Sequence, residues 1–380
     1  MSLSPENNFV SVGFTTPPSP ARFSISNVAL FVDEGDVSFA EGVKFFSSFP
    51  SAKEEITENS DTFIACKSIF QDNGYNISRH RGGVFIIKVD GDAVDLGLEI
   101  ASKIGEEEVK NSDFSLFTTT LALTFADTKT IRDALDPINH LFIATISDAD
   151  KELYDSEIAN GDFKSVKNVS YTLAGTEDEK ELLKARCGIL TQCAGNDVKI
   201  EAKRSIHRQP LGNVMLTKDD MPTQADKDTA TSKGVNVYTK YTYGIGDVMF
   251  LTDKGYDVND LTNIVNLKKS IIAFLTNEFT RTVNKNNDDL DLVKTRLENG
   301  IFDVFAENNV FSKDIKESEL ANITFGDYEA KKQSLIELRK GYFIDIPSAE
   351  TIEGKEVPIN VAIAISETVL SFNVGVNIIN

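Results

Sequence analysis

Positive charge is scarce in this 380-residue chain. The sequence has 39 lysine and arginine residues against 59 aspartate and glutamate residues, which gives a formal net charge of −20. A surface this acidic repels phosphate groups, which argues against nucleic acid or an anionic membrane as the main partner. Copies of the chain also repel one another at long range. Any homopolymer must therefore be held by apolar contact, strand pairing or local charge complementarity.

Cysteine is also rare, with three residues at Cys66, Cys187 and Cys193. An odd number without zinc or redox spacing argues against a disulfide framework and fits a reducing compartment. The sequence lacks a run of about 18 uncharged apolar residues, so we expect no membrane span. The opening residues lack the basic and apolar regions of a signal peptide. We therefore expect the protein to be made in the cytoplasm of a cell and to remain there during assembly.

Motifs for catalysis and cofactor binding are lacking as well. There is no phosphate-binding P-loop and no G-x-G-x-x-G after a strand. The three histidines, His80, His140 and His207, have no ligand partner at helical metal spacing. Acidic runs such as Glu106–Glu108 lack the residue pattern of a calcium loop. We therefore expect no cofactor, no metal site and no catalytic site, and we predict that the chain is not an enzyme.

What the sequence does contain is an alternation of strand-like and helix-like segments between about residues 80 and 250. The apolar run Gly82–Gly91, bounded by glycines, is typical of a buried parallel strand. Further strands are predicted at 114–125, 140–148 and 235–244, and helices at 95–104, 127–138 and 177–193. This order predicts an α/β fold (α+β overall), with a central, mainly parallel sheet and flanking helices.

The C-terminal third differs in pattern. Two amphipathic helices are predicted over 260–283 and 289–309, and the chain then returns to strand-like patterns at 340–348 and near its end. The predicted regions are an N-terminal arm (1–22), a strand and helix region (23–90), an α/β domain (91–250) and a C-terminal helical and β domain (251–380). Residues 366–380 form a predicted C-terminal arm.

The two ends of the chain carry the strongest pattern. Apolar residues alternate with small or polar ones in two consecutive C-terminal segments, and a shorter alternating segment precedes a proline-rich stretch near the N-terminus. The first C-terminal segment places Ile359, Val361 and Ile363 on one face. The last segment places Leu370, Phe372, Val374, Val376 and Ile378 on one face. The N-terminal segment places Val10, Val12 and Phe14 on one face.

Two interpretations of these terminal strands remain open. They can form a hairpin that closes its own domain, or they can leave it and add to a sheet edge in a neighbouring copy. Donatable strands at opposite ends of a chain favour a polymer over a closed dimer. In this second interpretation the acceptor sheet includes Ile359, Val361 and Ile363.

Basic residues cluster in two segments of this acidic chain. The candidate residues are Arg79, Arg81, Lys203, Arg204 and Arg208. One interpretation is a docking patch for an acidic partner, such as residues 33–62 of a neighbouring copy, where eight acids face two lysines for a net charge of −6. The other is a local fluctuation of surface composition.

The layout of these segments resembles that of contractile tail sheath proteins of tailed bacteriophages and related contractile injection systems. "FSISNVALFVDEGDVSFAEGVKFFSSFPSAKEEITENSDTFIACKSIF" is similar to the opening of that family, and "GVNVYTKY" is similar to a strand after its α/β domain. "YFIDIPSAETI", followed by "VPINVAIAISETVLSFNVGVNI", is similar to its end. The chain departs from the family at Glu367–Thr368, where small residues followed by histidine are common.

The resemblance implies a structural subunit that polymerises as stacked hexameric rings around a tail tube and contracts to drive the tube through a host envelope. It implies N- and C-terminal arms that pair with sheets of adjacent subunits. It also implies tube, baseplate and tail terminator proteins as partners and the virion tail as the final location. Two alternatives are a baseplate or tube component of the same kind of machine, and an α/β enzyme with an unrecognised site.

Overall fold

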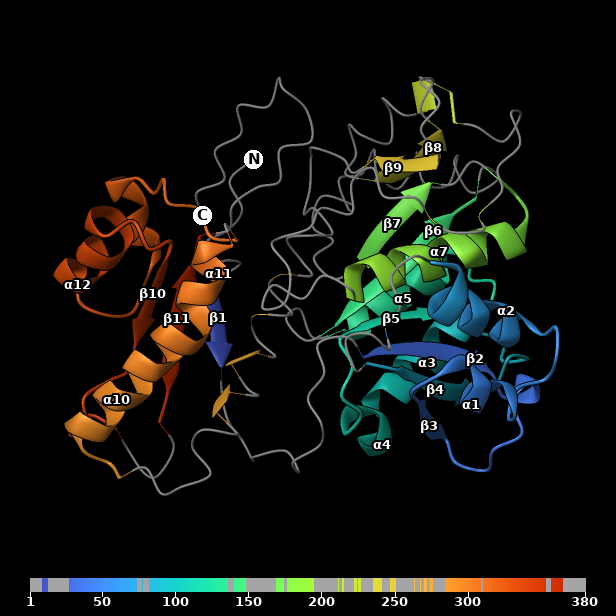
Figure 1. Ribbon diagram of the computed structural model, residues 1–380, viewed down its shortest axis with the longest axis horizontal. Coiled ribbons are helices and arrows are strands. Elements are labelled where there is room, and N and C mark those ends of the chain that lie inside the picture. The colour runs from blue at the N-terminus through green and yellow to red at the C-terminus, as the bar shows by residue number, and fades with distance from the viewer. Residues whose placement is uncertain are drawn as a thin grey trace. The chain divides into compact units, whose positions relative to one another are not determined.

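The computed structural model describes most of the chain, and it divides into two compact units (Figure 1). The described residues are 9–12, 27–73, 77, 82–135, 140–147, 169–173, 176–194, 211, 214, 222–223, 225–226, 235–240, 247–250, 263, 267, 270–271, 274–275, 284–308, 310–352 and 357–364. The α/β unit comprises Ser24–Asp197 and Ser205–Val265. The C-terminal unit comprises Met1–Phe23, Val198–Arg204 and Asn266–Asn380.

The described part of the α/β unit is built on an eight-stranded sheet. Its strands are β2 (Val28–Asp33), β3 (Val43–Phe46), β4 (Val84–Val89), β5 (Leu116–Thr119), β6 (Leu141–Ile146), β7 (Val169–Leu173), β8 (Asn236–Lys240) and β9 (Asp247–Phe250), in the order β3-β4-β2-β5-β6-β7-β8-β9. The six inner strands are parallel, and the edge strands β3 and β9 are antiparallel to their neighbours. The predicted mainly parallel central sheet is confirmed.

Helices cover both faces of this sheet. They are α1 (Phe49–Lys53), α2 (Asp61–Lys67) with its π-helical extension η3 (Ser68–Asp72), α3 (Leu96–Gly105), α4 (Glu107–Lys110), α5 (Phe125–Ala134) and α7 (Glu179–Ala194). Helix α3 packs against α5 and β4, whereas α7 packs against β5, β6, α2 and η3. Because both faces are covered, the sheet interior requires apolar residues at successive positions, and Val28 to Val32 of β2 are fully buried.

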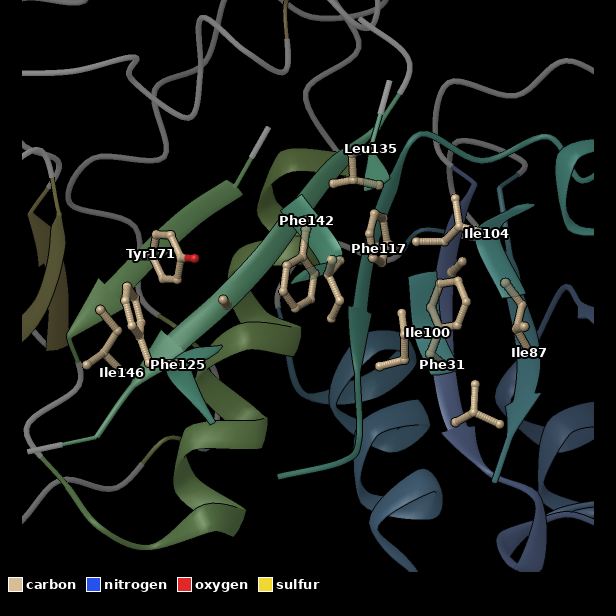
Figure 2. Packing of buried hydrophobic residues seen from close by; sticks show 14 of the residues in the cluster. Phe31, Ile87, Ile100, Ile104, Phe117, Phe125, Leu135, Phe142, Ile146 and Tyr171 are labelled. Atoms are coloured by element: carbon tan, nitrogen blue, oxygen red, sulfur yellow. The ribbon is translucent and has the colours of Figure 1, made fainter. Parts of the chain in front are cut away.

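The core on the α3–α5 face is rich in aromatic residues (Figure 2). The rings of Phe117 and Phe142 stack at a centroid distance of 5.0 Å, and Phe31 meets Phe117 edge-to-face at 5.3 Å. Ile100 and Ile104 of α3 belong to the same buried cluster. Since such side chains each stabilise a core by a few kcal/mol, this cluster contributes a large part of the stability of the unit.

The strand predicted over 114–125 is shorter in the structure. Strand β5 ends at Thr119, and α5 begins at Phe125 with a capping box between Thr124 and Asp127. Asp127 also accepts a hydrogen bond from the Gly97 N–H at 3.0 Å. A Cβ on Gly97 would lie 2.6 Å from the Asp127 Cα, so glycine allows the starts of α3 and α5 to approach closely.

The C-terminal unit packs helices around a small antiparallel sheet. One long helical segment runs through α10 (Asn287–Leu297), the π-helical turn η6 (Glu298–Phe302) and α11 (Asp303–Glu307). It is followed by η7 (Glu317–Asn322), α12 (Tyr328–Lys332) and the π-helical turn η8 (Gln333–Glu337). The sheet has the order β1-β11-β10, with β1 (Phe9–Val12), β10 (Tyr342–Asp345) and β11 (Ile359–Ile363). No helix among the described residues has the length and apolar character needed to cross a membrane.

Candidate strand-pairing site

Strand β11 is the central strand of the small sheet, and two distant segments of the chain pair with it (Figure 1). Strand β10 is antiparallel to it, with Phe343 opposite Ala362. Strand β1, from the start of the chain, pairs with its other edge, also antiparallel, with Val10 opposite Val361. The edge of β11 that faces β1 is therefore a site that accepts a strand from outside the local sequence.

One face of the sheet packs against an aromatic layer. Tyr342 of β10 is fully buried, and its ring lies 4.9 Å from that of Phe302 and 5.8 Å from that of Phe311. Phe311 in turn stacks on Phe305 of α11 at 6.1 Å. The apolar residues of β11 that share this face with Tyr342 and Ile344 are Ile359, Val361 and Ile363, and all three are buried.

The opposite face of the same strands is also covered. Ala362 of β11 and Phe343 of β10 belong to a buried cluster with Leu320, Ile323 and Leu335 from η7, η8 and the segment between them. The small side chain of Ala362 thus faces a second core rather than solvent. Small side chains fit there because the helical segments lie close to the sheet.

The ends of β10 and β11 are tied together by backbone hydrogen bonds. The Ala364 N–H donates to the Gly341 carbonyl at 2.9 Å, and the Ala364 carbonyl accepts from the Ser312 N–H at 2.7 Å. Gly341 has a φ of +74°, and a Cβ there would lie 2.5 Å from the Ser312 carbonyl oxygen. Glycine is therefore required where β10 begins.

A buried hydroxyl links the sheet to the long helix. The Tyr342 hydroxyl donates to a carboxylate oxygen of Asp303 at 2.7 Å. Burial, the hydrogen bond to Asp303 and the negative charges of Asp303 and Glu298 all raise the pKa of Tyr342. The raised pKa favours the protonated tyrosine, so its stabilising effect is full below pH ~10 and falls as pH rises above that value.

We predict that Tyr342→Phe lowers the free energy of unfolding by about 2 kcal/mol, because the partly buried Asp303 carboxylate loses a donor. Because phenylalanine does not ionise, the variant should also lack the part of the stability loss above pH ~10 that Tyr342 causes. Urea unfolding at several pH values measures both effects. Tyr328 also donates to a carboxylate at 2.7 Å, that of Glu317, but its side chain is exposed. Tyr328→Phe should leave stability unchanged, and equal effects of the two variants would contradict this assignment.

The structure brings together some of the residues predicted from the terminal patterns. Val10 and Val12 of β1 lie opposite Val361 and Ile359 of β11. That these strands pair between different subunits stays a prediction. The other residues predicted to act in assembly lie outside the described residues: Phe14, Leu370, Phe372, Val374, Val376, Ile378, Arg79, Arg81, Lys203, Arg204 and Arg208.

The carboxyl ends of the parallel strands are where an α/β enzyme would place a ligand, next to the point where strand order reverses between β2 and β5. In this structure the Arg186 side chain of α7 occupies the end of β5. Its Nε donates to the Thr119 carbonyl at 2.8 Å, and its Nη2 lies 3.4 Å from the carbonyl oxygens of both Thr120 and Leu121. Burial lowers the pKa of this guanidinium.

The acids at the same edge of the sheet have local backbone partners. Asp33 accepts from the Gly35 N–H at 2.8 Å, and Asp90 accepts from the Asp92 N–H at 3.0 Å. Within the part of the chain that the structure describes, no three histidine, cysteine or acidic side chains are grouped in a way that could hold a metal ion. These described polar side chains at the edge of the sheet thus form hydrogen bonds with the protein's own backbone.

Comparisons with known proteins identify the fold. No family model matches the chain, and no curated protein matches it in sequence. Among solved structures, it is similar to a chain of the anti-feeding prophage (AFP) baseplate in a 6-fold symmetrised cryo-EM structure, with 13% identity over 97% of each chain and a TM-score of 0.60. A chain of the AFP baseplate in the contracted state matches with 10% identity and a TM-score of 0.56, over 97% of this chain and 96% of that one.

A further likeness is to a chain of an extracellular contractile injection system, the PVC sheath complex in the contracted state. It has 11% identity and a TM-score of 0.62, and the match covers 97% of this chain and 96% of that one. Almost the whole chain, both units included, therefore shares one fold with chains of these assemblies.

Proposed function

We propose that this chain is a structural component of a contractile injection system, and more specifically a subunit of its sheath, without catalytic activity. The shared fold over 97% of the chain supports the wider class. The observation that carries the sheath assignment is the addition of β1 to the edge of β11. This pairing uses a segment from the far end of the chain, so the same edge accepts the equivalent strand of an adjacent subunit.

The sheath is a polymer of stacked hexameric rings around a tube. Within each of the two units, packed side chains cover both faces of the sheet, so each unit moves as a rigid body. Contraction then changes the contacts between subunits, while paired strands on long connections keep neighbouring subunits joined. Contraction is favoured because the contacts between subunits have a lower free energy in the contracted state. In this proposal, the partners are the tail tube, the baseplate and a terminator protein, and the assembled protein lies in the tail.

A baseplate component is the second candidate, because two of the similar chains come from AFP baseplate structures. Electron microscopy of the purified protein separates the two. A sheath subunit should form long tubes with a wide lumen at physiological salt, where the Debye length of about 8 Å screens repulsion between copies with a charge of −20. Rings or small closed assemblies without tubes would favour the baseplate component. A monomer at high protein concentration, with saturable binding of a nucleotide or metabolite, would contradict both and favour an enzyme.

A further inference from the structure

The strand that pairs with β11 in this structure belongs to the same chain. Strand β1 and β11 form an antiparallel pair from Phe9 opposite Ala362 to Val12 opposite Ile359. A sheath subunit that donates β1 to a neighbour must first release it from this position. The pairing of β1 with β11 of the same chain is a contact within the fold, and it therefore also competes with assembly.

The register shows which backbone groups hold β1. The Ala364 N–H donates to the Gly341 carbonyl, so alternate residues of β11, including Ala362 and Asn360, direct their backbone groups toward β10. Val361 and Ile359 then direct theirs toward β1, where they face Val10 and Val12. The backbone groups of Ser11, in contrast, point away from β11.

The connection between β1 and the α/β unit allows exchange. Fifteen residues, 13–27, separate the end of β1 from the start of β2. When extended they span at most about 50 Å, which is long enough for β1 to reach a neighbouring copy. Their sequence includes Pro17, Pro18 and Pro20.

We propose that β1 is a self-complementing strand: in the free chain it closes the strand-accepting edge of β11, and assembly requires its replacement by β1 of another copy. This inference rests on the proposed function. An intramolecular strand on a linker of fifteen residues acts at an effective concentration of about 1 mM, so chains at micromolar concentration keep their own strand. When β1 of another copy replaces the chain's own β1, the same backbone hydrogen bonds form. The free energy that drives the exchange therefore comes from the other contacts between subunits.

The test uses the full-length chain and a fluorescent peptide of residues 4–14. Val10→Pro removes an N–H that faces β11 and should open the edge, whereas Ser11→Pro removes one that faces away and serves as the matched control. We expect Val10→Pro to bind the peptide with an affinity roughly 100-fold higher than that of the unmodified chain or Ser11→Pro. Equal binding by all three proteins, or no binding by Val10→Pro, would overturn the proposal.

A second pair of variants tests the pairing directly. Ser11 and Asn360 are opposite residues of the kind that do not exchange hydrogen bonds, and their short Cβ separation suits a disulfide. Oxidised Ser11→Cys/Asn360→Cys should be a cross-linked monomer when dilute and should form tubes only after reduction. Cross-links between chains in dilute protein would contradict cis pairing. If the peptide result holds but the unmodified chain never forms tubes, the cis strand stands and the sheath function fails.

Discussion

Deletion of residues 369–380 is expected to leave a folded chain that no longer forms tubes. The backbone of β11 is already tied at Ala364, which bonds to Gly341 and to Ser312. The buried clusters on both faces of the sheet involve residues that precede the deletion. In the proposed function the removed segment is a strand donated to a neighbour, so its loss breaks the polymer and not the fold. Circular dichroism and size-exclusion chromatography measure the fold, and electron microscopy measures assembly.

The alternation of this segment provides a control that keeps the chain length constant. Phe372→Asn with Val374→Asn changes the predicted apolar face, whereas Ser371→Asn with Asn373→Ser changes only the predicted polar face. The first double variant should lose tubes as completely as the deletion, and the second should keep them. Tubes from the truncated chain, or equal loss in both double variants, would show that this strand does not act by donating its apolar face.

The central strands were predictable because their surroundings require a continuous apolar sequence. Strand β2 is buried from Val28 to Val32, and β4 is apolar except for Lys88, so few other structures are possible for either segment. Strand β7 was not predicted. It contains Ser170 and Thr172 between apolar residues, and parallel pairing with β6 on one side and β8 on the other holds "VSYTL" as a strand. Edge strand β3 was not predicted either. It lies in an acidic segment, and its strand conformation depends on pairing with β4.

The candidate site was predictable in part. Alternation in the sequence identifies β11 and its apolar face, Ile359, Val361 and Ile363. It does not show that Ala362 faces a second core, because that depends on where η7 and η8 pack. Similarly, a helix was predicted over 289–309, but the sequence pattern does not show the π-helical turn η6 within it. A Cβ on Gly300 would lie 2.6 Å from the ring of Phe274.

Arg186 had no sequence signal, and its replacement should have the largest effect on stability in the α/β unit. The residue lies in the helix predicted over 177–193, and its role depends on carbonyl groups more than 60 positions earlier in the chain. We predict that Arg186→Ala lowers the free energy of unfolding by about 3–5 kcal/mol, since it leaves buried carbonyls without donors. For a unit of this size the melting temperature should fall by roughly 10 °C. Lys184→Ala, which removes a partly exposed ion pair with Glu181 on the same helix, should change it little.

Arg186→Met separates hydrogen bonding from packing. Methionine fills much of the same volume but donates no hydrogen bond, so it should be nearly as destabilising as alanine if the guanidinium acts on the carbonyls of Thr119, Thr120 and Leu121. Recovery of stability by methionine would show that volume alone matters, as in cases where an apolar residue replaces a buried charge without loss. The expected result would also bear on function. A buried cation that is needed to bond the ends of the sheet strands is part of the scaffold, and a scaffold of this kind is suited to a subunit that must stay rigid while its neighbours move.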